Sequence, residues 1–239
     1  MGSDGRIAVA VRRVLGDLAA VMFPPVCHLC GLPLPPGERF VCAACVSGLP
    51  RTGYHTRPMN PMEQRFAGLF PFVRATGHFF YSRDSQLAQL VHDFKYRKFP
   101  GLARRLGEIA GTELLAAGFL SGVDVILPVP LHWRKLALRG YNQCRHIALG
   151  IEDASGIPVA DNIRAVRGHR TQTALTREER LHNTNGVFGV ERADEIDGKG
   201  VLILDDVCTT GATITAAATA VSEAAPAAKI HILTVGVTF

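Results

Sequence analysis

Two adjacent aspartates, Asp205 and Asp206, are the residues of this sequence best suited to chemistry. They follow four aliphatic residues at 201–204. After them comes a loop of small and hydroxyl-bearing residues: Thr209, Thr210, Gly211, Ala212 and Thr213. This order is typical of a buried parallel strand, a turn and a helix N-terminus, and ligands of open α/β sheets lie at that end of the strands. Helix N-termini bind phosphate, whereas carboxylates accept hydrogen bonds from sugar hydroxyls or help to hold a divalent cation. The stretch therefore predicts a site for a ribose 5-phosphate bearing a further charged group.

Cationic side chains follow a second predicted strand, at 123–127. Pro128 and Pro130 end this strand, because proline cannot join a central ladder. The next residues include four that are basic or can become so: His132, Arg134, Lys135 and Arg139. Cations beyond the carboxyl end of a parallel strand suit a pyrophosphate or a second phosphate.

The stretch at 167–185 is the least apolar part of the main domain. It carries, among others, the basic residues Arg167, His169, Arg170, Arg177 and Arg180. A weak hydrophobic content predicts a mobile loop or lid rather than core. An exposed charged helix at 176–182 is the alternative, and it is compatible with a lid.

Four cysteines near the N-terminus form two CxxC pairs, Cys27 with Cys30 and Cys42 with Cys45, separated by eleven residues that contain Pro and Gly. Two such pairs predict a closed tetrahedral zinc site, and a closed shell of four thiolates has a structural role. Four unligated cysteines are the alternative interpretation. A zinc ion would stabilise a knuckle too small to have its own core.

The elements that must position these residues alternate along the chain. Apolar runs at 123–127, 201–204 and 230–235 predict strands, and helical patterns at 84–96, 101–118 and 141–153 lie among them. The residues at 65–81 predict two short strands in a small hood beside the main sheet. The sequence therefore predicts an α/β fold with a mostly parallel, twisted sheet flanked by helices. It contains neither the dinucleotide-binding glycine pattern nor the P-loop pattern.

Composition is consistent with a globular protein that has a real core: of 239 residues, 47% are hydrophobic and 20% are charged. We expect an amphipathic N-terminal helix at 1–24, the zinc knuckle at 25–50, a linker at 51–64 and the α/β domain at 65–239. No apolar run is long enough to span a membrane, so we expect a cytoplasmic protein with reduced or metal-bound cysteines. The net charge of +5 favours anionic partners.

The stretch at 201–213 resembles the PRPP-binding signature of type I phosphoribosyltransferases. The wider pattern resembles the competence protein F (ComF) family, over nearly the whole chain. The double CxxC, Phe94-Lys95-Tyr96, the segments at 128–143 and 171–188 and the signature occur in that family's order. The resemblance implies a type I phosphoribosyltransferase fold with an N-terminal zinc knuckle. The family usually has Phe at the position of Tyr141, and an aliphatic or aromatic residue at that of Cys208.

The resemblance also implies roles for individual residues. Asp205 and Asp206 would hold the ribose hydroxyls, and Thr209, Thr210, Gly211, Ala212 and Thr213 would surround the 5-phosphate. The turn formed by Pro130, Leu131 and His132, together with Arg139, would face the pyrophosphate and its Mg²⁺. The stretch at 167–180 would close over the ligand, and we expect Asp205, Asp206 and Arg170 to be the catalytic residues.

Two functions are compatible with these features. One is a Mg²⁺-dependent phosphoribosyltransferase that serves DNA uptake or nucleotide metabolism. The other is a non-catalytic PRPP- or nucleotide-sensing module that binds single-stranded DNA or a helicase partner. Lys95, Arg97 and Lys98 form a basic cluster with interleaved aromatics; it favours DNA binding or is simply a solvated helix end. Cys208, beside a predicted helix N-terminus, is either a reactive thiol or a small apolar core residue.

Overall fold

The computed structural model describes residues 24–166 and 187–238. The predicted lid at 167–185, which contains Arg170, lies outside these ranges, as does nearly all of the predicted N-terminal helix at 1–24. The chain divides into two compact units, Met1–Leu49 and Pro50–Phe239. The first contains an isolated antiparallel bridge between Val26 and Pro33 and the short helix α2 (Ala43–Ser47).

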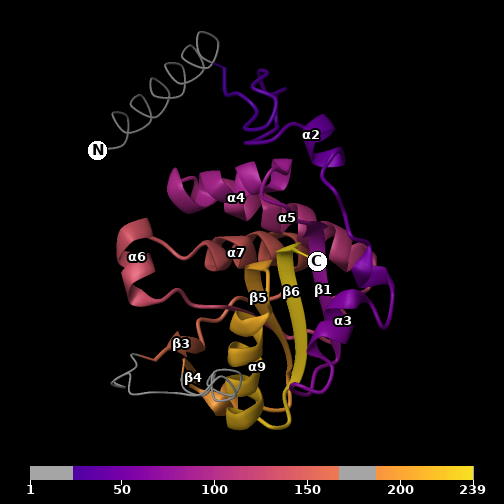
Figure 1. Cartoon of the computed structure of the whole chain (residues 1–239), viewed down its shortest axis with the longest axis vertical. Coiled ribbons are helices and arrows are strands. Elements are labelled where there is room, and N and C mark those ends of the chain that lie inside the picture. The colour runs from indigo at the N-terminus through magenta and orange to yellow at the C-terminus, as the bar shows by residue number, and fades with distance from the viewer. Residues whose placement is uncertain (1–23, 167–186, 239) are drawn as a thin grey trace, which may run out of the picture. The chain divides into compact units, whose positions relative to one another are not determined.

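A parallel four-stranded sheet forms the centre of the second unit (Figure 1). Its spatial order is β1 (Arg74–Phe80), β6 (Lys229–Val237), β5 (Gly200–Cys208) and β2 (Val125–Pro128). The predicted α/β fold with a mostly parallel sheet is confirmed. β5 lies between two partners, so its carboxyl end, with the two aspartates, faces the carboxyl end of β2.

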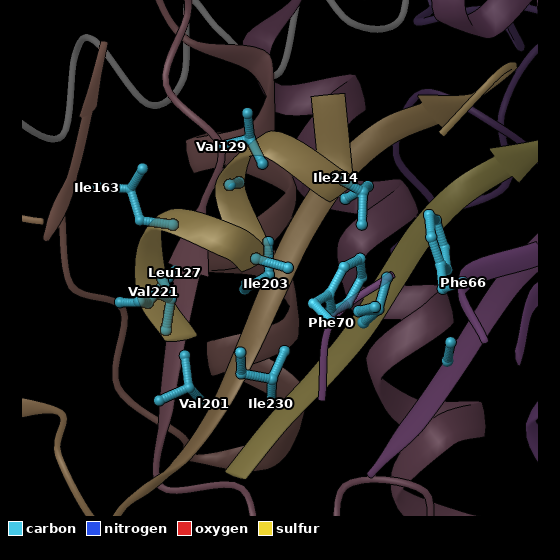
Figure 2. Packing of buried hydrophobic residues seen from close by; sticks show 14 of the residues in the cluster. Phe66, Phe70, Leu127, Val129, Ile163, Val201, Ile203, Ile214, Val221 and Ile230 are labelled. Atoms are coloured by element: carbon cyan, nitrogen blue, oxygen red, sulfur yellow. The ribbon is translucent and has the colours of Figure 1, made fainter. Parts of the chain in front are cut away.

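One face of the sheet packs against α3 (Pro61–Phe66) and α9 (Ala212–Ala224). Figure 2 shows Ile214 and Val221 of α9 above strand residues such as Ile203 and Ile230, with the rings of Phe66 and Phe70 beside them. Alternate residues of β5 point to this face, since successive side chains of a strand point to opposite sides. Beside α9, a two-stranded antiparallel sheet joins β3 (Ile163–Ala165) to β4 (Phe188–Val190).

The other face is covered by α5 (Pro100–Ala116) and α7 (Gln143–Ser155), which contact each other extensively and touch the strands. Glycines let the two helices approach closely: a Cβ on Gly107 would lie 2.0 Å from the carbonyl oxygen of Ile147. α4 (Gln86–Tyr96) contacts α5, and Ser85 caps its N-terminus by accepting a hydrogen bond from the Ala88 amide. Within the described ranges, no helix is long and apolar enough to cross a membrane. The remaining short elements are α6 (Trp133–Arg139) and the 3₁₀ turns Tyr54–Thr56 and Ala193–Glu195.

Residues 51–64, which we predicted as a linker, instead belong to the second unit. Asn60 explains the difference, because its side chain caps α3 and also donates a hydrogen bond to the Ala75 carbonyl of β1 at 2.9 Å. Met62 is fully buried in the core. The predicted hood at 65–81 is wrong: its second half is β1, which pairs with β6 in the main sheet.

A buried charged cluster ties β1 to α5. The Nε2 atom of His78 lies 3.1 Å from Oε2 of Glu113, and the guanidinium of Arg51 lies 2.7 Å from Oε1 of the same carboxylate. His78 is fully buried, and its ring stacks on that of His55. The close contact with His78, followed by the hydrogen bonds with Arg51, holds the pKa of Glu113 down at about 2. This carboxylate therefore stabilises the fold in its charged form.

We expect Glu113→Gln to lower the free energy of unfolding by about 2 kcal/mol at pH 7, the usual size for hydrogen bonds to a charged group. The pKa of Glu113 is depressed in the folded state, so its stabilisation is present above pH 4.5 and is lost as the pH falls towards 2. Urea unfolding should accordingly show a gap between variant and wild type that narrows between pH 7 and pH 3. Glu108→Gln, on the same helix in a surface pair with Arg105, is the matched control with little effect. A gap independent of pH would contradict the assignment.

Candidate ligand site and metal cluster

A cavity of about 270 Å³ opens at the carboxyl ends of β2 and β5. It brings together seven residues that the sequence predicted for one site: Asp205, Asp206, Thr213, Pro130, Leu131, His132 and Arg139. Residues 209–212 directly precede Thr213 in the chain but do not line the cavity. Its walls also include Lys95, Lys135, Gln143 and Cys144. Carboxylates and cations therefore share one small space, as a ligand with both hydroxyl and phosphate groups requires.

Asp206 is held by two side chains from other elements. Asp206 lies on the same face of β5 as the buried Leu202 and Leu204, because successive strand residues point to opposite faces. Its side chain therefore points away from α9. Its Oδ2 atom lies 2.8 Å from the ammonium of Lys95 and accepts a hydrogen bond from Nε2 of Gln143 at 2.6 Å. Burial opposes the charge on Lys95, but the Asp206 carboxylate outweighs it and raises the pKa of the lysine. Asp206 thus has both a counter-charge and a neutral donor.

Asp205 has a different environment, although it is the adjacent residue. Among the described residues, both hydrogen bonds of its carboxylate go to Oδ1: from the Asp206 amide at 2.8 Å and from the Cys144 thiol at 3.4 Å. Burial, and then the charge of Asp206, raise the pKa of Asp205 to about 7. Burial also raises the pKa of Cys144 well above its ordinary value, so this thiol stays protonated and donates. Among the described residues Asp205 forms no ion pair, whereas Asp206 is paired with Lys95, so of the two acids Asp205 is the one left to bind a ligand hydroxyl.

A ring of contacts links the acid pair to the basic wall of the cavity. Gln143, which donates to Asp206, accepts a hydrogen bond from the guanidinium of Arg139. That guanidinium lies over the ring of Tyr96, 5.6 Å from its centroid, and Tyr96 follows Lys95 in α4. Arg139 is therefore already oriented beside the cavity.

The turn between α6 and α7 is built by three further residues. Gly140 has a φ of +84° and ends α6, a conformation that a side chain would strain. The hydroxyl of Tyr141 donates to the carbonyl of Phe94 in α4. Asn142 caps α7 and donates to the carbonyl of Val129 after β2 at 3.1 Å. Residues 139–143 therefore join α4, β2 and β5 around the cavity.

Gly211 begins α9 at the edge of the cavity, with a φ of +85°. A Cβ at this position would lie 2.9 Å from the ring of Phe66, so the close approach of α3 also requires glycine. The Thr210 hydroxyl accepts a hydrogen bond from the Ala212 amide. The first amides of α9 have no acceptor within the helix, which makes its N-terminus suitable for a phosphate.

Arg65 of α3 fixes the loop that precedes this helix. Its guanidinium donates to the carbonyl of Thr209 at 2.9 Å and to that of Thr238 at 2.8 Å. It also lies 3.3 Å from the sulfur of Cys208, which is buried in the core. Burial raises the pKa of Cys208, the opposite of what a reactive thiol needs, so Cys208 is a core residue.

The first unit contains a cluster of four thiols. The sulfur atoms of Cys27, Cys30, Cys42 and Cys45 all lie within 4.8 Å of one another. Gly31, at a φ of +72°, closes the turn after the first pair by donating to the Cys27 carbonyl, and Cys42 is the N-cap of α2. This group is suited to hold a metal ion.

Two of these thiols, Cys27 and Cys45, have shifted pKa values of opposite direction. Burial opposes it at Cys27, but the backbone amides of Cys30 and Cys42 outweigh burial and lower the pKa of Cys27 to about 6. At Cys45, hydrogen bonding with the thiol of Cys42 raises the pKa to about 12. Four thiolates at these distances repel one another unless a cation lies among them.

Comparison with known proteins decides the family. Residues 140–236 match the model of the phosphoribosyl transferase domain. The chain is 30% identical to the DNA utilization protein YhgH of Salmonella typhi, over 80% of this chain and 88% of that protein. The chain belongs to the ComF family. Competence protein F of Haemophilus influenzae is 29% identical, over 54% of this ComF chain and 58% of its own length.

Among solved structures, the ComF chain is similar to the glutamine phosphoribosylpyrophosphate amidotransferase of B. subtilis complexed with ADP and GMP. The identity is 19% and the TM-score is 0.41, over 60% of this chain and 30% of that one. At this score the likeness supports no conclusion beyond the one drawn from the sequence comparisons.

Among the residues that line the cavity of this ComF chain, three with hydrogen-bonding side chains were not predicted for the site: Lys95, Gln143 and Cys144. A signal for Lys95 was present, because it lies four residues after Val91 and eight after Leu87, in line with the buried stripe of α4. Its charge led us to place it on a basic surface instead. Gln143 and Cys144 begin α7, and only the packing of that helix brings them to β5.

Proposed function

We propose that this protein binds PRPP in the cavity and transfers or holds its ribose 5-phosphate group, as a phosphoribosyltransferase-type protein linked to DNA uptake. One observation supports this above the others. A single cavity combines an acid pair at the end of β5, the N-terminus of α9 and a wall of cations after β2. These three features correspond to the hydroxyls, the 5-phosphate and the pyrophosphate of one ligand.

The two acids have different roles in this proposal. Asp205 accepts hydrogen bonds from the ribose hydroxyls, because its carboxylate lines the cavity and is not paired with Lys95. Asp206, which is bound by Lys95 and Gln143, fixes the position of its neighbour. The 5-phosphate lies at the edge of the cavity next to Thr213, where residues 209–213 surround it with the α9 amides as donors.

The pyrophosphate lies against the segment from Pro130 to His132, with Lys135 and Arg139 as counter-charges. These cations stabilise the negative charge that develops on the leaving group as the bond to the anomeric carbon breaks. Mg²⁺, which the family implies, would supply further positive charge at this side of the cavity when it is bound with the ligand. Arg170, outside the described residues, joins them in our proposal when its segment covers the ligand.

The four-cysteine cluster holds a structural zinc ion in this proposal. Four sulfur donors satisfy the tetrahedral preference of zinc and leave no open position for a substrate. In the described part of unit 1, the buried hydrophobic residues are Cys27, Val41 and Leu49. A metal ion therefore provides the stability that so small a core lacks.

A second candidate function, binding of single-stranded DNA, is favoured by the surface around α6. Trp133 is 48% exposed and Tyr96 is 65% exposed, and each has an arginine over its ring, Arg134 and Arg139 respectively. The segment from His132 to Tyr141 contains no acidic residue. Exposed aromatics among cations suit stacked bases and their phosphates. The names of the relatives, DNA utilization protein and Competence protein F, agree with this function.

We expect Asp205→Asn to weaken PRPP binding by about 10- to 100-fold, the cost of losing hydrogen bonds to a charged acceptor. Calorimetric titration with PRPP and Mg²⁺ measures the change. Asp161→Asn is the matched control, since Asp161 forms a surface ion pair with Arg145 and does not line the cavity. Unchanged affinity in Asp205→Asn would sink the site assignment. Release of pyrophosphate with a panel of bases as acceptors then distinguishes transfer from binding alone.

Purified protein should contain about one equivalent of zinc per chain, because a Cys₄ site holds one ion. Cys30→Ser should lose most of it and lower the melting temperature, as measured by metal analysis and calorimetry. Cys30 is exposed, so its replacement does not disturb packing. Cys144→Ser, outside the cluster, should keep the zinc. Equal zinc content in the two variants would contradict the site.

Trp133→Ala should weaken binding of oligo(dT) by about 5- to 100-fold, the usual cost of losing one stacked base. Because Trp133 is the sole tryptophan, quenching of its fluorescence reports binding in the wild type, and anisotropy of a labelled oligonucleotide compares the variants. Leu138→Ala is the control on the same helix, 81% exposed but without ring or charge. Equal affinity of both variants would exclude α6 as the contact surface.

A further inference from the structure

Lys95 is an unusual residue for the wall of a site that is proposed to bind a ligand together with Mg²⁺, because its side chain is itself a cation. Its side chain is only 19% exposed and its ammonium lies 2.8 Å from Oδ2 of Asp206. A buried ammonium is costly unless a charge compensates it, so this pairing is a built part of the site. The neighbouring residues hold it in place, because Phe94 is fully buried and Tyr96 lies under Arg139.

The acid pair would otherwise be a good place for a divalent cation. One donor atom each from Cys144, Asp205 and Asp206 lies within 4.8 Å of the others. Carboxylates are the ligands that Mg²⁺ and Mn²⁺ prefer in proteins. The ammonium of Lys95 already lies 2.8 Å from Oδ2 of Asp206. A metal ion bound to the same carboxylates would be strongly repelled by this ammonium, because little water screens the two charges.

We propose that the Lys95 ammonium is the resident cation of the acid pair and keeps free divalent metal ions off the carboxylates of Asp205 and Asp206. The metal of the reaction then enters on the pyrophosphate of the ligand, on the side of the cavity formed by the residues after β2. Lys95 is a positioning residue in this scheme: its ammonium fixes the side chain of Asp206 in place while Asp205 stays available to the ligand.

This inference deepens the proposed function, but its test needs no PRPP. Zinc-loaded protein is titrated with Mn²⁺ alone, and free Mn²⁺ is followed by electron paramagnetic resonance. The wild type should show no site at the acid pair. Lys95→Met, which has a similar length and no charge, should gain one site that binds Mn²⁺ about 100-fold more tightly than the wild type does, the scale of one removed unit charge. The double variant Lys95→Met with Asp206→Asn should lose that site.

Two matched variants separate charge from contact. Lys95→Arg keeps the charge and should bind Mn²⁺ as weakly as the wild type. Gln143→Leu removes the other donor to the same oxygen of Asp206 but no charge, so it should gain no comparable site. If Lys95→Met does not fold, Lys95→Gln, which still donates to Asp206, takes its place.

Tight Mn²⁺ binding by the wild type that Asp206→Asn abolishes would overturn the proposal, as would a folded Lys95→Met protein with no gain. A protein that fails to bind PRPP, yet gains the Mn²⁺ site in Lys95→Met, would refute only the proposed function. The two failures are therefore distinguishable.

Discussion

The fold around the cavity depends on one electrostatic constraint, the presence of two neighbouring carboxylates at the end of a buried strand. Both carboxyl groups are held at the site, because both aspartates belong to β5. Compensation comes from elsewhere: an ammonium from α4, an amide from α7 and a thiol from the same helix. These contacts determine where the two helices meet the sheet, so the chemistry of the site and the packing of one layer share the same bonds.

The acidic and the basic residues of the cavity differ in how firmly their side chains are held. The acids are fixed by partners and largely enclosed, whereas Lys135 and Arg139 lie on a short helix without buried residues. In the proposed complex, the rigid acids would select a sugar by the geometry of its hydroxyls, and the exposed basic residues would adapt to a flexible pyrophosphate. Residues 139–143 connect the two sides, since they bind Asp206 at one end and end α6 at the other.

The sequence alone predicted those features whose cause is local. The strand, acid pair and glycine turn at 201–211 form one continuous pattern, and the cysteine spacing is sufficient to bring four thiols together. It placed the strand structure at 65–81 in a separate hood rather than in the main sheet, because Gly77 and the buried His78 interrupt the apolar pattern of β1. Nor did it predict the role of Lys95, whose burial depends on an acid more than a hundred positions away in the chain. An ion pair between residues far apart in the chain produces no periodic pattern in the sequence.

The position of α4 in the chain has a consequence for how this protein is divided. The segment that matches the phosphoribosyl transferase domain begins at residue 140, after both α4 and β1. A fragment cut at that boundary would leave Asp206 without the ammonium of Lys95 and would open β6 as a bare sheet edge. The segment that matches the domain model and the unit of folding are therefore not the same: the matched segment is completed by residues that precede it.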